Sequence, residues 1–501
     1  MNQSKFNIEE VTRRLLDCIP PAAIAEADRL GCELYAVGGC IRNPLLGYEV
    51  GDIDLAVVGD APELARRIAR ALNAGPVTIY ARFGTALLHT ANRQFEFATA
   101  RTESYLPDSR QPAEVQPVPI EQDLKRRDFT VNAMALAVNG PRQGGLIDLF
   151  NGYSDLQAGI LRTPLNPEVT FRDDPLRMLR AVRFAAELGF EIHPDTWLGL
   201  KSQLARLRIV APERIGNEFW KMLEGRNPVR AMQLLIDSGM MAFIIPEVTA
   251  MAGVDQVNRH HHKDVLRHSL KVMQNVAAQT SDPAVRLAAL LHDVGKPATK
   301  RFDGQIGWTF HGHEVVGANL TWRIGRRLRL GREVLEKITR LVRHHMRPIN
   351  LTSEGVSDSA IRRLMVDLGE ALDDQLILCR ADITTANPNL VKNYLANFDE
   401  MARRMGDVEA RDRMRAFQSP VRGEQIMELC GIPPGPLVGA LKERVEDAIL
   451  DGIIPYEYEA AREYLLKIKD EVLNTGLETL SVERRQRSQE RRLVTGEFQF
   501  P

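Results

Sequence analysis

The chain has 501 residues and a formal net charge of −1, with 65 lysines and arginines against 66 aspartates and glutamates. This length predicts several domains, and no apolar run approaches the length needed to cross a membrane. The five cysteines are scattered without a C-x-x-C pair, which argues against a disulfide framework and against a zinc site built from thiolates. The first residues lack a signal-peptide pattern, so we expect a cytoplasmic location.

The first 150 residues predict a mixed region of strands and helices. Residues 1–30 have the pattern of a helical lead-in, after which short strands are expected at 34–37, 53–58, 77–80, 86–89 and 95–98. A helix at 61–73 places Leu64, Ile68 and Leu72 on one side. Residues 102–122 are rich in proline and polar residues, which predicts a long, mobile loop.

The rest of the chain predicts helices. Strand signals stop after Asp148, and helical patterns follow over 170–250, 260–400 and 420–470. The block 260–400 holds nine of the eleven histidines, and the arginine-rich stretch 471–501 predicts a frayed tail. We therefore expect five regions, with bounds 1–150, 151–255, 256–400, 401–470 and 471–501.

Two aspartates one residue apart stand at the start of a predicted strand. Side chains alternate along a strand, so Asp52 and Asp54 share one face while Ile53 turns to the core. Two such carboxylates repel each other unless a cation lies between them, and oxygen ligands at this spacing suit Mg²⁺. Upstream, Gly38 and Gly39 allow the backbone to approach a triphosphate. The pattern indicates a magnesium site beside a nucleotide.

A third carboxylate is expected on a neighbouring strand. Glu96 alternates with Phe95 and Phe97, so it faces away from their side of the sheet. A single glutamate on a strand is usually exposed to solvent, and both interpretations stand at this point.

Two charged segments follow. In the first, Asp128 and Asn132 come after two adjacent arginines at helical spacing, which suits triphosphate oxygens and a ribose. The second begins at Phe171, and a surface helix with ion pairs would account for its spacing by itself. The charged residues of the two segments are Arg126, Arg127, Asp128, Asp173, Asp174, Arg177 and Arg180.

Together these motifs resemble the family of class II tRNA nucleotidyltransferases and bacterial poly(A) polymerases. The matching patterns are G-G-x-x-R, D-x-D, R-R-D-F-T-x-N-A and D-D-P-x-R, in the family's order, over about residues 30–250. The resemblance implies a multidomain α+β fold. Its head would be a polymerase β-like nucleotidyltransferase with a mixed sheet and helices, followed by an all-α neck and body and further helical regions.

The resemblance also implies roles for single residues. Asp52 and Asp54, with Glu96 as their partner, would bind Mg²⁺ for the attack of a primer 3′-hydroxyl on the α-phosphate. Contacts to triphosphate and sugar would come from Gly38, Gly39, Arg42, Arg126, Arg127, Asp128 and Asn132. The base of CTP or ATP would be selected by Asp174 and Arg177, with Asp173 and Arg180 beside them. Asn43 and Asp173 depart from the family, which usually has Asp and Glu at these places.

The second helical block predicts another metal site. His292 and Asp293 follow an apolar helical run, where an imidazole and a carboxylate can bind a divalent metal from a helix end. The pattern resembles an all-α HD-type phosphohydrolase domain through His268, His292, Asp293 and Asp382. The resemblance adds His313, His344 and His345 as candidates for a second metal, and Lys296 and His311 as phosphate-facing residues. It implies hydrolysis of phosphate esters with Mn²⁺, Mg²⁺, Fe²⁺ or Ni²⁺.

These observations predict an enzyme that adds or repairs the 3′-terminal CCA of tRNA from CTP and ATP, releases pyrophosphate, and carries an HD phosphohydrolase. Its expected partners are the tRNA 3′ end and the two nucleotides, with neither a membrane nor an obligate protein partner; the region 401–470 is a further candidate for tRNA binding. The same motifs fit a poly(A) polymerase or an enzyme that adds only A or only CC. Alternatives of another class are an HD phosphohydrolase whose N-terminal half only binds RNA, and a regulatory tRNA-binding protein. The intact pair of Asp52 and Asp54 argues against a mere binding module.

Overall fold

The computed structural model describes residues 7–91, 93–105, 112–258, 261–305, 307–350, 357–384, 388–412 and 417–474. The chain forms two compact units, Met1–Ile244 and Ile245–Pro501. Within the described residues, no helix combines the length and the apolar composition that crossing a lipid bilayer requires.

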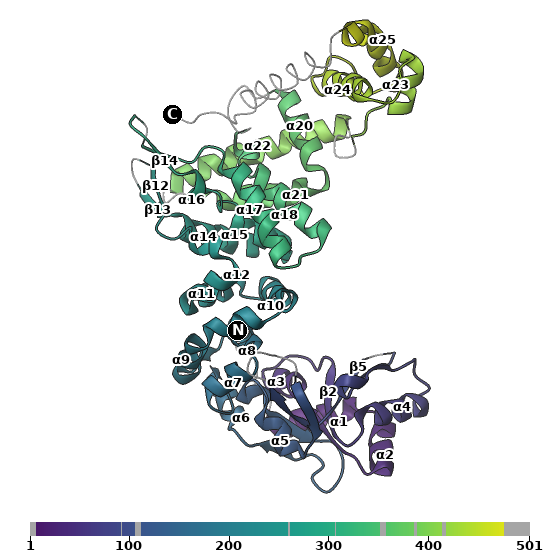
Figure 1. The fold of residues 1–501 in the computed structure, drawn as a ribbon, viewed down its shortest axis with the longest axis vertical. Coiled ribbons are helices and arrows are strands. Elements are labelled where there is room, and N and C mark those ends of the chain that lie inside the picture. Colours follow the sequence, from purple (N-terminus) through teal and green to yellow (C-terminus); the bar gives the residue numbers. More distant parts are fainter. Residues whose placement is uncertain are drawn as a thin grey trace. The chain divides into compact units, whose positions relative to one another are not determined.

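A seven-stranded mixed sheet forms the centre of the first unit (Figure 1). The strand order is β3-β4-β5-β2-β1-β8-β9, in which β2 and β5 run parallel and the other neighbouring pairs are antiparallel. The five strands expected from the sequence are present. The strands are β1 (Glu33–Val37), β2 (Ile53–Val58), β3 (Thr78–Tyr80), β4 (Thr85–His89), β5 (Gln94–Thr99), β8 (Met134–Ala137) and β9 (Leu146–Asp148).

Helices cover both faces of this sheet. On one face, Ile120 and Leu124 of α5 pack against a cluster that includes Tyr35 of β1 and Ala56 of β2. On the other, α4 packs against β4 and β5, and its Leu64 is fully buried. Burying a side chain of this size contributes about 1.5–3 kcal/mol. The helices are α1 (Ile8–Cys18), α2 (Pro21–Leu30), α3 (Gly39–Leu45), α4 (Ala61–Ala71) and α5 (Ile120–Lys125).

The segment 102–122 is not the long loop that its composition predicted. It contains an antiparallel hairpin of β6 (Arg101–Tyr105) and β7 (Pro112–Pro117), after which α5 begins at Ile120. Both prolines lie at the ends of β7, where the missing N–H interrupts little of the ladder. The helical spacing of Asp128 and Asn132 was also misleading, because α5 ends at Lys125 and a 3₁₀ turn, η2 (Thr130–Asn132), leads into β8.

Helices complete the first unit, as expected, with two exceptions. The two-residue strands β10 (Ile160–Leu161) and β11 (Glu191–Ile192) pair in parallel, so strands do not end at Asp148. The run from Asp173 to Arg180 is also not one helix, because Asp174 is extended and precedes Pro175, which disfavours helical geometry. The helices are α6 (Gly152–Ala158), α7 (Pro167–Asp173), α8 (Leu176–Leu188), α9 (Pro194–Ser202), α10 (Pro212–Glu224), α11 (Pro228–Ser238), α12 (Met241–Ile244) and the 3₁₀ segment η3 (Leu204–Ile209).

The second unit begins with a mostly helical region that also contains two short hairpins. Two antiparallel hairpins, β12 (Asp255–Asn258) with β13 (His261–Asp264) and β14 (Arg301–Asp303) with β15 (Gly307–Thr309), interrupt the block predicted as all-α. The second hairpin pairs aromatic residues, which favour strands over helices. The helices are α13 (Pro246–Thr249), α14 (Val265–Ala277), α15 (Pro283–Leu291), α16 (Lys296–Thr299), α17 (His313–Arg327), α18 (Arg332–His344), α19 (Arg347–Asn350), α20 (Asp358–Leu368), η4 (Gly369–Ala371) and α21 (Leu372–Asp382).

Four helices follow, α22 (Pro388–Asp412), α23 (Gly423–Cys430), α24 (Pro436–Leu450) and α25 (Tyr458–Asn474). The expected boundary at residue 400 falls inside α22. Gly431 ends α23 in the left-handed conformation that glycine adopts without strain. Leu441 and Val445 of α24 are buried with Leu465 of α25. Helix α25 continues past 471, where the tail was expected, and residues 475–501 lie outside the described residues.

Candidate active site and metal centre

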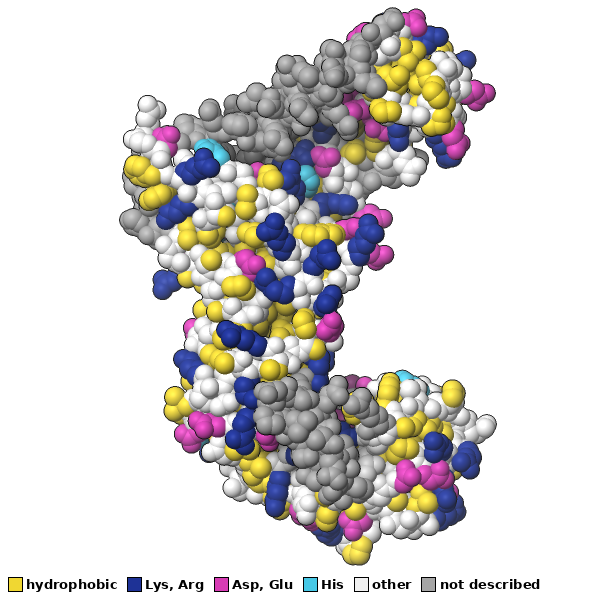
Figure 2. Space-filling view, in the orientation of Figure 1, with side chains coloured by type: hydrophobic (Ala, Val, Ile, Leu, Met, Phe, Trp, Pro, Cys, Tyr) yellow, Lys and Arg dark blue, Asp and Glu magenta, His cyan; other side chains and the backbone are white. Residues whose placement is uncertain are grey.

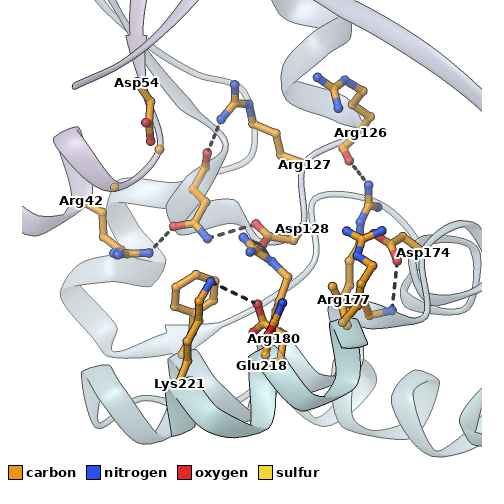
Figure 3. A pocket seen from close by; sticks show the side chains of 17 residues that line it. Arg42, Asp54, Arg126, Arg127, Asp128, Asp174, Arg177, Arg180, Glu218 and Lys221 are labelled. Carbon is orange, nitrogen blue, oxygen red and sulfur yellow. Dashed lines mark hydrogen bonds and ion pairs between the residues drawn. The ribbon is translucent and has the colours of Figure 1, made fainter. Parts of the chain in front are cut away.

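A cavity of about 660 Å³ lies in the first unit between the edge of the sheet and helices α8 and α10 (Figure 3). Seven arginine and lysine side chains line it against four carboxylates, an excess of positive charge that suits a polyphosphate. Eleven residues predicted from the sequence line this cavity: Gly38, Gly39, Arg42, Asp54, Arg126, Arg127, Asp128, Asn132, Asp174, Arg177 and Arg180. Asp52, Glu96 and Asp173 do not line it.

Of the three expected carboxylates, Asp54 lies at the sheet end of the cavity, and Asp52 and Glu96 are exposed beside it. Asp54 is paired in register with Glu96 on the parallel neighbour β5, while Ile53 is fully buried, as the alternation predicted. Asp52 is exposed and directly precedes β2. Burial and the nearby Glu96 and Asp52 raise the pKa of Asp54 to about 6, against the opposing effect of Arg127. The ionised form of Asp54 is therefore unfavourable until a cation approaches.

The glycine pair brings the backbone close to these charged groups. Gly38 has a φ of 73°, and a Cβ added there would lie 3.6 Å from Arg127 Nη1 and 3.8 Å from Asp54 Oδ2. Such a Cβ would be strained by the positive φ and would lie beside both the Asp54 carboxylate and the Arg127 guanidinium. Glycine therefore keeps this corner of the cavity open.

Arg42 is held by two amide side chains. It is 6% exposed, its Nη1 donates to Asn132 Oδ1 at 2.6 Å, and its Nε and Nη2 donate to Asn43 Oδ1 at 3.0 and 2.8 Å. Burial lowers the pKa of Arg42. Asn43, which departs from the family's usual Asp, therefore still orients this arginine through a carbonyl oxygen.

Asp123 clamps the two adjacent arginines. Its Oδ1 accepts from Arg126 Nη2 at 2.6 Å and its Oδ2 accepts from Arg127 Nη2 at 3.0 Å. Burial alone would raise the pKa of Asp123, but Arg127 and Arg126 outweigh it and the pKa is lowered. The sequence analysis quoted no role for Asp123, although two arginines three and four residues downstream are a usable signal.

Asp128 holds Arg180 rather than facing the cavity with free oxygens. Its Oδ2 accepts from Arg180 Nε and Nη2 at 2.8 and 2.6 Å, and its Oδ1 accepts from Asn132 Nδ2 at 3.0 Å and from Phe129 N at 2.8 Å. Although burial opposes it, Arg180 lowers the pKa of Asp128 to about 2. Arg180 thus pairs with a carboxylate of the first charged segment, a contact that the helical spacing within the second segment did not indicate.

The chain leaves helical geometry at Asp174, just before α8, and this break orients Asp174 and Arg177, the two residues expected to select the base. Asp174 Oδ1 accepts from Leu176 N at 3.0 Å at the start of α8. Arg177 Nη2 donates to the backbone oxygen of Arg126 at 2.5 Å, which ties α8 to the arginine segment. Figure 3 shows Asp174 and Arg177 on the side of the cavity away from Asp54.

The second unit contains two groups of metal-binding side chains. His268, His292 and Asp382 form one, and Asp293, His313 and His345 form the other; within each group the ligand atoms lie within 4.8 Å of one another. They come from α14, the end of α15, the start of α17, the residue after α18 and the end of α21. Among the described residues, Asp52, Asp54 and Glu96 are not gathered this tightly.

Asp293 joins the two groups. Its Oδ2 lies 3.2 Å from His292 Nε2, while its Oδ1 lies 3.4 Å from His313 Nε2. Asp382 Oδ1 lies 2.8 Å from His268 Nε2. Burial opposes protonation of His292, but Asp293 and Asp382 outweigh it and raise its pKa to about 9. In the absence of a metal, a proton thus compensates the buried carboxylates.

Three of the histidine rings are oriented by the same contact. The Nδ1 atoms of His292, His313 and His345 lie 2.8–2.9 Å from the backbone oxygen three residues earlier. Because a carbonyl only accepts, each Nδ1 carries a proton, so Nε2 is the atom that each ring directs at the centre. His313 Nε2 and His345 Nε2 face each other at 3.2 Å, which suits a shared cation. Imidazoles and carboxylates without thiolates fit a divalent transition metal or Mg²⁺.

The other residues predicted for the HD centre, His344, Lys296 and His311, do not all lie at it. His344 belongs to neither group, and its Nδ1 lies 3.3 Å from Arg347 Nη1. Lys296 does reach the centre, because its Nζ donates to Asp293 Oδ2 at 2.7 Å. His311 is exposed. Gly295 allows α17 to approach, since a Cβ there would lie 2.1 Å from the backbone oxygen of His313.

Comparisons with known proteins match the parts of the chain that contain these two sites. Family models match a poly A polymerase head domain at 34–162, a probable RNA and SrmB-binding site of polymerase A at 189–251, and an HD domain at 265–387. The multifunctional CCA protein of Nitrosococcus oceani is 35% identical over 320 residues, which are 62% of this chain and 74% of that protein. The chain belongs to the CCA-adding tRNA nucleotidyltransferase family. It therefore combines a nucleotidyltransferase head with an HD domain.

Further members of the family match more of the chain. The A-adding tRNA nucleotidyltransferase of Deinococcus radiodurans is 31% identical over 85% of this chain and 93% of its own length. The crystal structure of the Bacillus stearothermophilus CCA-adding enzyme in complex with CTP has a TM-score of 0.62 at 23% identity and covers 91% of this chain and 97% of that one. The latter likeness establishes the fold.

This nucleotidyltransferase also uses residues that the sequence analysis did not place in the site. Leu176 and Phe184 of α8 and four polar residues of α10, Arg214, Asn217, Glu218 and Lys221, line the cavity. Glu218 is 4% exposed and accepts from Arg183 Nε at 2.8 Å. The spacing of 214, 217/218 and 221 places them on one helical face, a signal that would have identified them. Phe184 carries three guanidinium groups, of Arg42, Arg180 and Arg183, within 4.2–5.1 Å of its ring centre.

Proposed function

We propose that this chain completes the 3′-terminal CCA of tRNA with CTP and ATP at the cavity of the first unit. The observation that carries the proposal is a basic cavity with Asp54 at one end and the pair Asp174 and Arg177 at the other. A nucleoside triphosphate has a matching arrangement of groups, because it has anionic phosphates at one end and a hydrogen-bonding base at the other.

The residues divide the work of nucleotide transfer. Arg126 and Arg127, held apart by Asp123, present fixed donors to the triphosphate, and this orientation costs nothing at the moment of reaction. Asp52 and Asp54 are the proposed ligands of Mg²⁺, with Glu96 beside them. When bound, the metal would neutralise charge at the α-phosphate and activate the primer 3′-hydroxyl.

Asp128 has a positioning role in this proposal. Its two oxygens already accept four hydrogen bonds, so it fixes Arg180 and Asn132 and contacts the nucleotide only through them. Asp174 and Arg177 offer an acceptor and a donor for the edge of the base, which distinguishes cytosine and adenine from bases with the opposite pattern.

Adding only the terminal A is the second candidate. The relative from Deinococcus radiodurans, which matches 85% of this chain, is an A-adding enzyme. The two are separated by incubating the protein and Mg²⁺ with tRNA that ends before CCA or after CC, and with CTP, ATP or both. Ordered addition of C, C and A supports the proposal, and extension only of the CC-ending tRNA supports the second candidate. No incorporation under any condition would overturn both.

We further propose that the HD centre is a metal-dependent phosphohydrolase. The support is the pair of ligand groups joined by Asp293. His292→Ala should abolish hydrolysis of p-nitrophenyl phosphate while nucleotide incorporation continues, and Asp54→Ala should do the reverse. Loss of both activities in either variant would contradict two independent sites.

A further inference from the structure

The hairpin of β14 and β15 presents two aromatic rings to solvent. Phe302 and Trp308 are directly opposite each other in the register, so they share one face of the hairpin. Their ring centres lie 5.2 Å apart with the planes at 71°, yet Phe302 is 68% and Trp308 40% exposed. Figure 2 shows hydrophobic side chains beside basic ones over the region that Figure 1 labels β14. We call the side that carries both rings the hairpin face.

Lysines alternate with the aromatic residues of the hairpin face. Lys300 Nζ lies 4.5 Å from the ring centre of Trp308. Phe310, two residues after Trp308 and about 6.6 Å further along the chain, has Lys296 Nζ 5.8 Å from its ring centre. The acidic residue of the hairpin, Asp303, alternates with Phe302 and so belongs to the opposite face, where it accepts from Gln305 N.

The two segments that flank the hairpin both contact the HD centre. On one side, Lys296 of α16 donates to Asp293 Oδ2 at 2.7 Å. On the other, the backbone oxygen of Phe310 orients His313 through Nδ1 at 2.9 Å. The hairpin face is therefore a strip of rings and ammonium groups that ends at the metal-binding residues.

Hairpin stability alone does not account for this strip. A cross-strand aromatic pair stabilises a short hairpin, and that contribution requires only that the rings touch each other. It does not require Lys300 and Lys296 to accompany the rings. Lysine is depleted in protein–protein interfaces, whereas aromatic rings combined with cations are the usual surface for single-stranded nucleic acid.

We propose that the hairpin face binds the bases of a single-stranded RNA segment whose phosphate ester enters the HD centre. Bases stack on Phe302 and Trp308, Lys300 attracts the phosphate between them, and Lys296, which is paired with Asp293, meets the phosphate ester at the HD centre. The second part rests on the proposed phosphohydrolase function, whereas binding of bases to the rings does not.

Binding is tested with two fluorescently labelled probes in EDTA, a five-nucleotide single-stranded RNA and an abasic chain with the same phosphates. Phe302→Ala and Trp308→Ala should each weaken binding of the RNA about tenfold and leave binding of the abasic chain unchanged. Trp308→Phe keeps a ring and should restore most of the affinity. The matched control is Trp322→Ala on α17, since Trp322 is 37% exposed and lies outside the hairpin. Any binding of the probe at the nucleotide cavity should be the same in all variants, because none of the substituted residues lines that cavity.

Hydrolysis of p-nitrophenyl phosphate with added Mn²⁺ separates this proposal from the function on which it rests. The ester has no nucleobase, so the hairpin variants should retain its hydrolysis, and this also shows that they fold. If the unmodified protein hydrolyses no ester with any divalent metal, the phosphohydrolase proposal fails while the binding assay still decides the role of the rings. Equal RNA affinity in the unmodified protein, Phe302→Ala and Trp308→Ala would overturn the proposal.

Discussion

Asp54→Asn should stabilise the metal-free protein at neutral pH although it abolishes nucleotide transfer. The fold raises the pKa of Asp54 from 3.8 to about 6, because the carboxylate is buried beside Glu96 and Asp52. A shift of about two units corresponds to about 3 kcal/mol, and partial access to solvent reduces the cost to ~1–2 kcal/mol. Asparagine has nearly the same shape and no charge, so the variant avoids this cost.

The sign of the effect fixes its pH dependence. A carboxyl group whose pKa is raised by folding binds its proton more tightly in the folded state, so the unmodified protein loses stability as pH rises from about 4 to 6. The difference between Asp54→Asn and the unmodified protein should be near zero below pH 4 and complete above pH 7. For a unit of this size we expect a gain in Tm of about 2–8 °C at pH 7.5.

The assay is thermal unfolding in EDTA, followed on the transition that shifts when Mg²⁺ and CTP are added. Asp17→Asn is the matched control, because it removes the same charge from an exposed position of α1 in the same unit. Adding Mg²⁺ should raise the Tm of the unmodified protein and reduce the advantage of Asp54→Asn. A variant that is less stable than the unmodified protein at pH 7.5, or whose gain is the same at pH 4, would refute the reasoning.

Three further changes test the geometry of the two sites. Gly38→Ala puts a Cβ 3.6 Å from Arg127 Nη1 at a φ of 73°, and this strain should cost about 1–2 kcal/mol of stability. Steady-state kinetics should show the KM for CTP raised at least about tenfold. An unchanged KM would contradict a close approach of the backbone at Gly38 to the nucleotide. Asp128→Asn weakens the bidentate pair with Arg180 and should lower kcat/KM by about 10–100-fold. Part of this loss should be recovered at low salt. Full activity of the variant would contradict a positioning role for Asp128. His313→Ala should lower the metal content of the purified protein, measured by mass spectrometry, without affecting incorporation, and an unchanged metal content would exclude His313 as a ligand.

The sequence was informative where chemistry and local geometry coincide. The alternation along the strand predicted that Ile53 turns to the core, and the apolar run before His292 predicted a helix that ends next to it. Tertiary contacts decided the rest. Arg180 pairs with Asp128 from a distant segment, and no local rule predicts that partner.

The errors have physical causes that composition conceals. The hairpin of β6 and β7 was taken for a loop because prolines are frequent in this segment, although Pro112 and Pro117 lie at the two ends of β7. Helical spacing after Phe171 suggested ion pairs, but Pro175 breaks the helix between the charges. Which of His344 and His345 points at the metal centre depends on how the end of α18 is rotated about its axis. Packing sets that rotation, and two adjacent histidines in the sequence do not reveal it.

The backbone contacts of His292, His313 and His345 have a consequence for how the HD domain acquires its metal. The three rings lose their conformational entropy when the domain folds. This cost therefore does not reduce the affinity of the centre for a metal that binds later. Chelation should therefore leave helices α15, α17 and α18 in place, and reloading should need no refolding.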